Sequence, residues 1–261
     1  WPLLIAGLAG IMNQNIDKII YPFLFENKEI ANHQLGIYGA NYKIAMVMIM
    51  FIQAFRFAYE PLMFSKKNED KATKNKEYAD AMKYFVMFGL LIFLVVMFYL
   101  DIFKVLISSK YYEGLVVVPY LLAAELCYGI TFNLSLWYKN IDKTYWAIVF
   151  TFIGFVVMIT IITTCVPTFG YIACAWAALA CYLSMMIASY LVGRKVNPIE
   201  YEVKRIFSYV LITAVLFGIS LLVETPYAWL NILIRTILLI SYVVIVIKRE
   251  KIHLNLKKLK R

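Results

Sequence analysis

The sequence predicts an all-α integral membrane protein with about eight transmembrane helices. Of its 261 residues, 63% are hydrophobic and only 16% are charged, and the mean hydropathy is +0.74. Soluble globular domains are usually about 45–50% apolar and about 25% charged, so this composition lies outside their range. Long apolar stretches recur with short polar gaps, and the roughly ten-residue alternation of transmembrane strands is absent.

Each predicted helix has about the 17–25 residues that a bilayer crossing requires. The second is long enough to tilt or to project from the membrane, and Pro61 is expected to bend or end its membrane portion. In the sixth, Ala173, Ala177 and Cys181 follow a four-residue spacing that favours close helix packing. The predicted helices span residues 3–25, 36–64, 83–101, 116–138, 145–165, 170–193, 206–223 and 228–247.

The start of the chain and its cysteines indicate which chemistries to expect. The chain begins at Trp1, without the basic segment and cleavage site of a signal peptide, which favours a piece of a longer protein. Its four cysteines lie in or beside apolar runs and form no CxxC pair, and only two histidines occur. We therefore expect packed thiols, with no metal site, no disulfide framework and no cofactor. The cysteines are Cys127, Cys165, Cys174 and Cys181.

Basic residues in the connections predict the orientation in the membrane. One alternating set of segments holds 19 of the 26 Lys and Arg residues, and the other set holds three. Because cytoplasmic loops carry an excess of Lys and Arg, the first set and both ends of the chain are expected in the cytoplasm. The basic end KREKIHLNLKKLKR is expected to touch anionic lipid rather than nucleic acid. The basic set comprises Ser65–Lys83, Tyr138–Lys143, Gly193–Arg205 and the tail from Lys248.

The first predicted helix carries a polar face where lipid would be expected. In IMNQNIDKIIYPFLF, polar and charged residues interrupt an otherwise apolar run. With about 3.6 residues per turn, Asn13, Gln14, Asp17 and Lys18 fall on one side of this helix. Polar groups without partners are costly in hydrocarbon, so this side is expected to face the protein or a water-filled cavity. The opposite side is formed by Leu8, Met12, Ile16, Ile19 and Ile20.

The second and fourth predicted helices repeat this arrangement. In the second, Arg56 and Glu60 lie four residues apart and can pair along the helix, whereas Lys43 lies off the polar face. In the fourth, Glu125 shares a broad face with Tyr128, Thr131, Phe132 and Ser135. The polar face of the second helix consists of Tyr38, Asn41, Gln53, Arg56 and Glu60.

Two interpretations of these charges are open. Lys18 and Arg56 can supply cations at two depths of a cavity, with Asp17, Glu60 and Glu125 as counter-ions. Alternatively, long basic side chains near an interface snorkel, and the charges form structural pairs. The second interpretation has more weight for Lys43 and Arg235, which belong to no polar face. The clustering of polar residues on consecutive helices favours a solvated path.

Two stretches carry a resemblance to a known family. NIDKIIYPFLF and LGIYGANYKIAMVMIMFIQAFRFAYEPLMFSK resemble the seventh and eighth membrane helices of polysaccharide flippases. These are the Wzx-type O-antigen and capsule exporters of bacteria, in the superfamily that also holds multidrug (MATE) exporters and lipid II flippases. The most specific stretch is Leu35–Lys66, and the remainder resembles the family in helix count, loop charge and basic end.

The resemblance implies a fold and an activity. Residues 1–193 would form the second six-helix lobe of a MATE-like fourteen-helix fold, and residues 194–261 an additional terminal helix pair with a basic cytoplasmic tail. The family flips undecaprenyl-diphosphate-linked oligosaccharide across the bacterial cytoplasmic membrane by alternating access, for surface polysaccharides such as the O-antigen of lipopolysaccharide. By this resemblance, the protein is not expected to be an enzyme.

The resemblance also implies roles for individual residues and for partners. Phosphate contacts would come from Lys18, Arg56 and Lys43, because Lys and Arg pair with phosphate oxygens. The expected partners are the lipid-linked oligosaccharide, membrane lipids, H⁺ or Na⁺ as coupling ion, and the polysaccharide polymerase and chain-length machinery. Sugar contacts would come from Asn13, Gln14, Asn41 and Gln53, and ion coupling from Asp17, Glu125 and Glu60.

Two rival functions differ in the chemistry they require. A cation-coupled drug or small-molecule exporter of the same superfamily would favour an acidic, aromatic cavity. Here the basic residues at membrane depth only slightly outnumber the acidic ones. A polysaccharide polymerase or other glycan-modifying membrane enzyme needs a general base or nucleophile, often with a large external loop. The longest external segment, 101–115, is short, and neither histidine lies at membrane depth.

Overall fold

The computed structural model describes residues 2–65, 70–223 and 225–250, and no strand occurs in these ranges. Long helices follow one another, with short helical turns in the connections. In chain order the elements are α1 (Pro2–Ile20), η1 (Tyr21–Leu24), α2 (Lys28–Ser65), α3 (Lys71–Phe98), α4 (Leu100–Phe103), η2 (Lys104–Leu106), η3 (Ser109–Val117), α5 (Val118–Leu134), α6 (Leu136–Asn140), α7 (Tyr145–Phe169), α8 (Tyr171–Val196), α9 (Val203–Leu222) and α10 (Ala228–Glu250).

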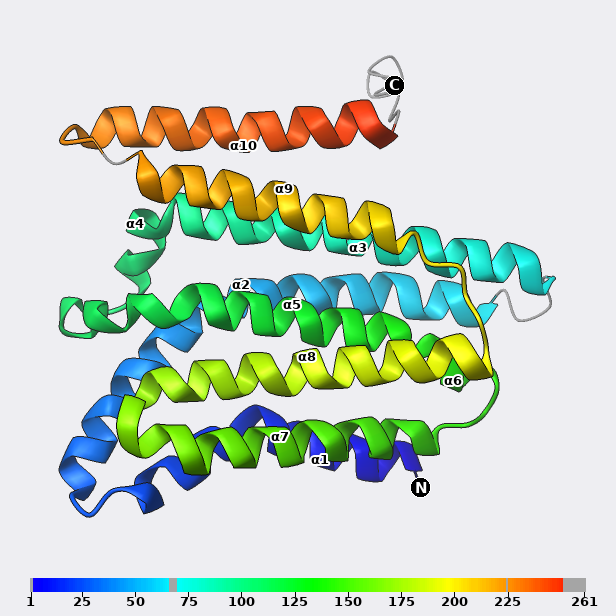
Figure 1. Cartoon of the computed structure of the whole chain (residues 1–261), viewed down its shortest axis with the longest axis horizontal. Helices are drawn as coiled ribbons and strands as arrows, with labels where there is room; N and C mark the ends of the chain where they lie inside the picture. Colours follow the sequence, from blue (N-terminus) through cyan, green and yellow to red (C-terminus); the bar gives the residue numbers. More distant parts are fainter. Residues whose placement is uncertain (1, 66–69, 224, 251–261) are drawn as a thin grey trace.

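The long helices lie side by side in an array that has α5 near its centre (Figure 1). On one side of α5, α8 packs against both α5 and α7, and α1 packs against α7. On the other side, α2 and α3 contact α5, and α9 and α10 dock on α3. Helix α10 therefore forms one edge of the array, and α1 and α7 form the opposite edge (Figure 1).

Seven helices of the described part of the chain are long and apolar enough to cross a membrane, as a multi-pass membrane protein requires. Eight were expected, and the helix without such an apolar stretch is α1. It forms a helix of 19 residues, but the polar residues between Asn13 and Lys18 lower its hydropathy. The seven lie within Lys28–Pro61, Ala72–Phe98, Ser109–Asn140, Tyr145–Phe169, Tyr171–Val196, Val203–Leu222 and Trp229–Glu250.

The segment between the second and third predicted helices is helical from Lys71 onward. Helix α3 begins at Lys71, twelve residues before its predicted start at 83. Asp70 is the N-cap, and its side chain accepts a hydrogen bond from the Thr73 amide at 3.1 Å. An N-cap side chain of this kind satisfies an amide that has no partner within the helix. Helix α2 continues through Pro61 to Ser65, whereas its apolar span ends at Pro61.

Burial confirms the two faces predicted for the first helix. Asn13 and Asp17 are 1% and 2% exposed, whereas Leu8, Met12 and Ile19 are about half exposed. Ile16, which was placed on the lipid side, is buried instead. The polar side of α1 thus faces neighbouring helices, which removes Asn13 and Asp17 from hydrocarbon.

The small residues of α8 lie where the helix is sandwiched between α5 and α7. Ala173, Ala177 and Cys181 are fully buried, so the predicted packing stripe is confirmed. The turn that joins α7 to α8 is made at Gly170, whose φ of 58° is readily adopted only by glycine. This tight turn lets α7 and α8 pack along their full length.

The helix ends that border the basic connections lie at one end of the array (Figure 1). Figure 1 shows that α8 and α10 end, and that α3, α7 and α9 begin, on the side where α1 starts. The placement agrees with the alternation assumed in the charge analysis. Which side of the membrane this end occupies stays a prediction, and the basic tail 251–261 and segment 66–69 lie outside the described residues.

Candidate substrate-binding site

Asp17 connects α1 to α2 inside the protein. Its carboxylate accepts a hydrogen bond from the Tyr38 hydroxyl at 2.7 Å and another from the Lys18 amide at 2.8 Å. Both Asp17 and Tyr38 are almost completely buried. A buried carboxylate needs such donors, because removing it from water is costly. Tyr38 thereby fixes the position of Asp17 between the two helices.

A second carboxylate, Glu125 on α5, belongs to the same neighbourhood. The Tyr42 hydroxyl donates to Glu125 Oε1 at 2.9 Å, and the Lys18 ammonium lies 4.1 Å from the centroid of the Tyr42 ring. Glu125 Oε2 is buried and has no hydrogen-bond partner among the described residues. Tyr42 therefore contacts both the half-buried Lys18 ammonium and the buried Glu125 carboxylate. One oxygen of that carboxylate accepts no hydrogen bond from the described residues. The structure brings Asp17, Lys18 and Glu125 together, as their polar faces predicted.

Two amides for which sugar contacts are predicted also connect helices. Asn13 Nδ2 donates to the Thr151 carbonyl of α7 at 3.1 Å. Asn41 Nδ2 donates to the carbonyls of Ile37 and Tyr111 at 2.8 and 2.9 Å, and so ties α2 to η3. Since both side chains are buried in helix contacts, their donors are engaged by the fold.

Arg56 lies between α2 and α5 and is held by an aromatic ring. Its guanidinium carbon is 4.1 Å from the Phe132 centroid, a distance typical of a cation–π contact. Its Nε is buried without a hydrogen-bond partner, and no carboxylate of the described residues lies within ion-pair distance of it. The predicted Arg56–Glu60 pair is therefore not formed. Glu60 Oε1 pairs with Lys139 Nζ at 2.8 Å, because α6 brings this second cation to the same place.

The remaining predicted site residues lie around or away from these groups. Gln14 and Gln53 are half-buried, and Lys43 is exposed. Arg235 on α10 approaches Asp101 at 3.6 Å and donates to the Phe98 carbonyl at 3.3 Å. This contact belongs to the docking of α10 on α3.

A separate charged cluster joins α3 to α9 and α10. Lys83, 4% exposed, lies 2.8 Å from Glu202, 3.1 Å from Asp80 and 3.4 Å from Glu250. Arg205 lies 2.7 Å from Glu202 and 3.5 Å from Glu250. The hydrogen bond that Glu202 accepts from Lys83 holds the pKa of the Glu202 carboxyl below its usual range. Three carboxylates share two cations here, and Lys83, which was counted among the loop charges and placed at the start of the third predicted helix, is buried.

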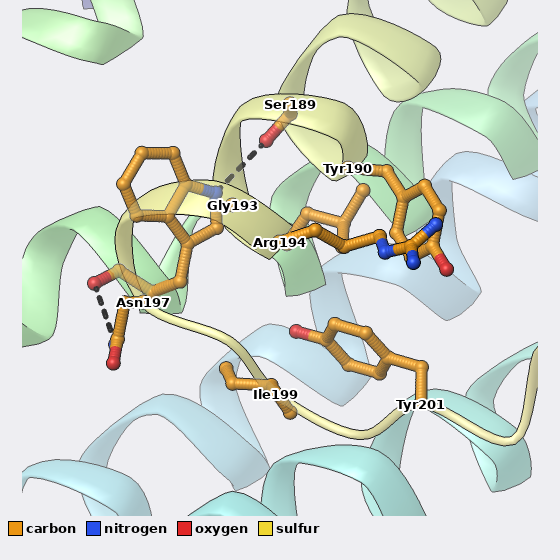
Figure 2. A pocket seen from close by; sticks show the side chains of 9 residues that line it. Ser189, Tyr190, Gly193, Arg194, Asn197, Ile199 and Tyr201 are labelled. Atoms are coloured by element: carbon orange, nitrogen blue, oxygen red, sulfur yellow. Dashed lines mark hydrogen bonds between the residues drawn. The ribbon is translucent and has the colours of Figure 1, made fainter.

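Two hollows lie away from the predicted site residues. One, too narrow to admit a water molecule, lies where α6, α8 and the segment 197–201 meet (Figure 2). There Trp137 Nε1 donates to Ser189 Oγ at 3.3 Å, and a Cβ on Gly193 would come within 3.0 Å of the Trp137 ring. Because the α8 backbone at Gly193 and the Trp137 ring lie this close, we interpret the hollow as a helix-packing contact. The other is an open groove of about 620 Å³ lined by Glu29, Ile30, His33, Gln34, Ile37, Glu113 and Tyr171.

Three residues that shape the site were missed as site residues. Tyr42 follows Tyr38 by four residues, so helical spacing could have placed it on the same face. Phe132 was assigned to a polar face, but nothing in the sequence shows that it lies beneath Arg56. Lys139 was counted only among the loop charges, because its pairing with Glu60 is a contact between α6 and α2 that only the tertiary structure shows.

No protein-family model, curated protein or solved structure matches the chain. The residues and their geometry therefore carry the functional argument that follows.

Proposed function

We propose that the protein is a transporter of the polysaccharide-flippase type, which moves an oligosaccharide linked to undecaprenyl diphosphate across the bacterial cytoplasmic membrane. The observation that carries this proposal is Arg56. Its guanidinium lies among membrane-spanning helices, contacts an aromatic ring and has no carboxylate partner among the described residues. An interior cation without a counter-ion is costly to maintain and is best explained by an anion that arrives from outside the chain.

The chemistry of the carrier fits such a cation. A diphosphate is the one strongly charged feature that different lipid-linked glycans share, and a guanidinium offers several N–H donors to phosphate oxygens. The sugars are neutral or variable, so the half-buried amides Gln14 and Gln53 are suited to contact their hydroxyl groups. Arg56 would therefore recognise the carrier, and the amides would contact the glycan.

The neighbourhood of Asp17 suits ion coupling. Asp17 and Glu125 are both almost completely buried, and Glu125 has one oxygen without a donor among the described residues. Binding of H⁺ or Na⁺ there would neutralise charge in the interior, and a diphosphate that attracts Lys18 would favour such uptake. Linkage between the two binding events would drive alternating access.

The remaining parts of the proposal concern architecture. Residues 1–193 would form one six-helix lobe of a MATE-like fold, and 194–261 the terminal helix pair. Helices α9 and α10 dock on the outer side of α3, which supports this division. The C-terminus would lie in the cytoplasm.

The test is a flipping assay with the complete protein in liposomes that contain undecaprenyl-diphosphate-linked oligosaccharide. Transport is read as the fraction of glycan that becomes accessible to an added glycosidase. Arg56→Ala should reduce the initial rate about tenfold or more, because a hydrogen bond between charged groups contributes about 1.5–3 kcal/mol. Arg56→Lys should retain part of the rate. Lys143→Gln, which removes an exposed cation, is the matched control. An unchanged rate in a folded Arg56→Ala protein would remove Arg56 from the site.

The rival function is a cation-coupled exporter of small cationic molecules. The observation that favours it is the presence of two buried carboxylates, Asp17 and Glu125, each of which accepts a hydrogen bond from a tyrosine hydroxyl. The same liposomes discriminate the two functions. A fluorescent cationic drug should not be moved by the protein, whereas uptake of the drug without flipping of the glycan would favour the exporter.

A further inference from the structure

The ring of Phe132 is in contact with two cations from different helices. Arg56 Cζ on α2 lies 4.1 Å from its centroid, and Lys139 Nζ on α6 lies 4.6 Å from the same point. The two charge centres can therefore be no further apart than these two distances combined. A diphosphate has oxygens on both phosphorus atoms and can approach both cations, since charged N–H···O contacts are about 2.7–2.9 Å long.

The two cations differ in what neutralises them. Lys139 is paired with Glu60 at 2.8 Å, and these side chains are 17% and 28% exposed. Arg56 has no carboxylate partner among the described residues, and its Nε is buried without an acceptor. The local group thus carries two positive charges and one negative charge. Arg56 Nε has no acceptor among the described residues, whereas the Lys139 ammonium is already paired with the Glu60 carboxylate.

We infer that Glu60 is an internal substitute for a phosphate group, which the diphosphate of the substrate displaces from Lys139 when it binds Arg56. This inference rests on the proposed function and adds Lys139 and Glu60 to its site. A carboxylate held near Lys139 competes with the incoming anion and repels it, because like charges in a partly buried site interact more strongly than in water. Glu60 therefore weakens the binding of anions that cannot contact both cations, and it sets the selectivity for a diphosphate.

A purely structural role predicts a different behaviour. If the Glu60–Lys139 pair only ties α2 to α6, neutralising Glu60 would lower stability and leave anion affinity unchanged or reduced. If Glu60 competes with phosphate, neutralising it raises the affinity. The sign of the change therefore separates the two roles, even where both variants are slightly less stable.

The experiment titrates inorganic pyrophosphate into the purified protein in phosphatidylcholine nanodiscs and measures its Kd by calorimetry. Glu60→Gln should lower the Kd about tenfold, the effect expected from removing one nearby like charge in a partly buried site. Lys139→Gln and Arg56→Gln should each raise it about tenfold or more. Glu200→Gln and Lys143→Gln make the same charge changes at exposed positions and should leave it unchanged. If Glu60→Gln or Lys139→Gln fails to fold, Glu60→Asp and Lys139→Arg, which keep the charge, should bind within a few-fold of wild type.

Several outcomes would overturn the inference. These are an absence of pyrophosphate binding by the wild-type protein, and an unchanged or higher Kd in folded Glu60→Gln. A third is loss of pyrophosphate binding when the nanodiscs contain phosphatidylglycerol, which would assign the site to anionic membrane lipid. Failure here remains distinct from failure of the proposed function. Flipping lost in Arg56→Ala with Glu60→Gln affinity unchanged removes only the role of Glu60, whereas the predicted Kd changes without any flipping remove only the transport proposal.

Discussion

Two charged regions of this protein have opposite electrostatic designs. Around α3, α9 and α10, the buried Lys83 meets three carboxylates, and each acid is held by a cation. Between α2 and α5, Arg56 meets an aromatic ring and no carboxylate of the described residues. In the first region, every charged side chain named here has a partner of opposite charge. In the second region, Arg56 has no carboxylate partner among the described residues, and its buried Nε–H group has no acceptor.

The difference separates structural charge from functional charge. A fully paired cluster fixes the position of helices, and its loss is expected to appear as loss of stability. A cation that is held by π-electrons keeps its donors available for an external anion, so its loss is expected to appear in binding and transport.

Lys83→Ala should have the largest effect on stability. It leaves three carboxylates near one another, one of them the nearly buried Glu250, and breaking a buried pair costs about 3–5 kcal/mol. Thermal unfolding in detergent should show a large decrease in Tm. Lys104→Ala, which breaks an exposed pair with Asp101, is the control and should cost less than about 1 kcal/mol. Equal changes in Tm for the two variants would mean that the cluster does not hold α9 and α10 on α3.

Tyr38→Phe should have the next largest effect. It removes the hydroxyl that donates to the buried Asp17, and an unsatisfied buried acceptor costs about 1–3 kcal/mol. The free energy of unfolding, measured with denaturant, should decrease accordingly. Tyr227→Phe, at an exposed ring, should change it by less than about 0.5 kcal/mol. No change in Tyr38→Phe would show that Asp17 finds another donor.

Asn41→Ala should cost about 1–2 kcal/mol, because Asn41 donates to two carbonyls that join α2 to η3. Transport per folded molecule should be retained. Gln53→Ala on the same helix should show the reverse, with little change in stability and slower transport. If Asn41→Ala lowers transport at unchanged stability, the sugar contact predicted for it from the sequence is restored.

The smallest effect is a pH dependence at Glu202. The hydrogen bond that Glu202 accepts from Lys83 holds the pKa of the Glu202 carboxyl below its usual range. The pair therefore stabilises the fold above the unfolded pKa of about 4.3, and this contribution disappears as the pH falls through the lower folded value. Because the side chain is 40% exposed, solvent screening limits the loss to about 1 kcal/mol or less. Glu202→Gln should flatten the curve of unfolding free energy against pH below about pH 4.3, and an unchanged slope would contradict the assignment.

The sequence was most informative where a pattern repeats along a helix. The apolar runs predicted the seven helices that are long and apolar enough to cross a membrane. The period of α1 predicted a polar face turned towards the protein or a water-filled cavity, and Asn13 and Asp17 of this face are buried in the protein. It was less informative where partners come from distant helices. The spacing of Arg56 and Glu60 permitted a pair along α2, but the fold supplies Lys139 from α6, a residue 79 positions away in the chain. Lys83 was counted among the loop charges, because only the tertiary structure shows that Glu202, which precedes α9, and Glu250 of α10 lie beside it.

The most direct test compares Arg56→Gln with Lys83→Gln in one preparation, measuring Tm and the rate of glycan flipping per folded molecule. Arg56→Gln should keep a Tm close to wild type and lose about tenfold or more of the rate, as expected for a lost charged hydrogen bond. Lys83→Gln should lower the Tm and keep the rate per folded molecule. The account is contradicted if Arg56→Gln unfolds while its folded fraction transports normally, or if Lys83→Gln stays fully stable and stops transport.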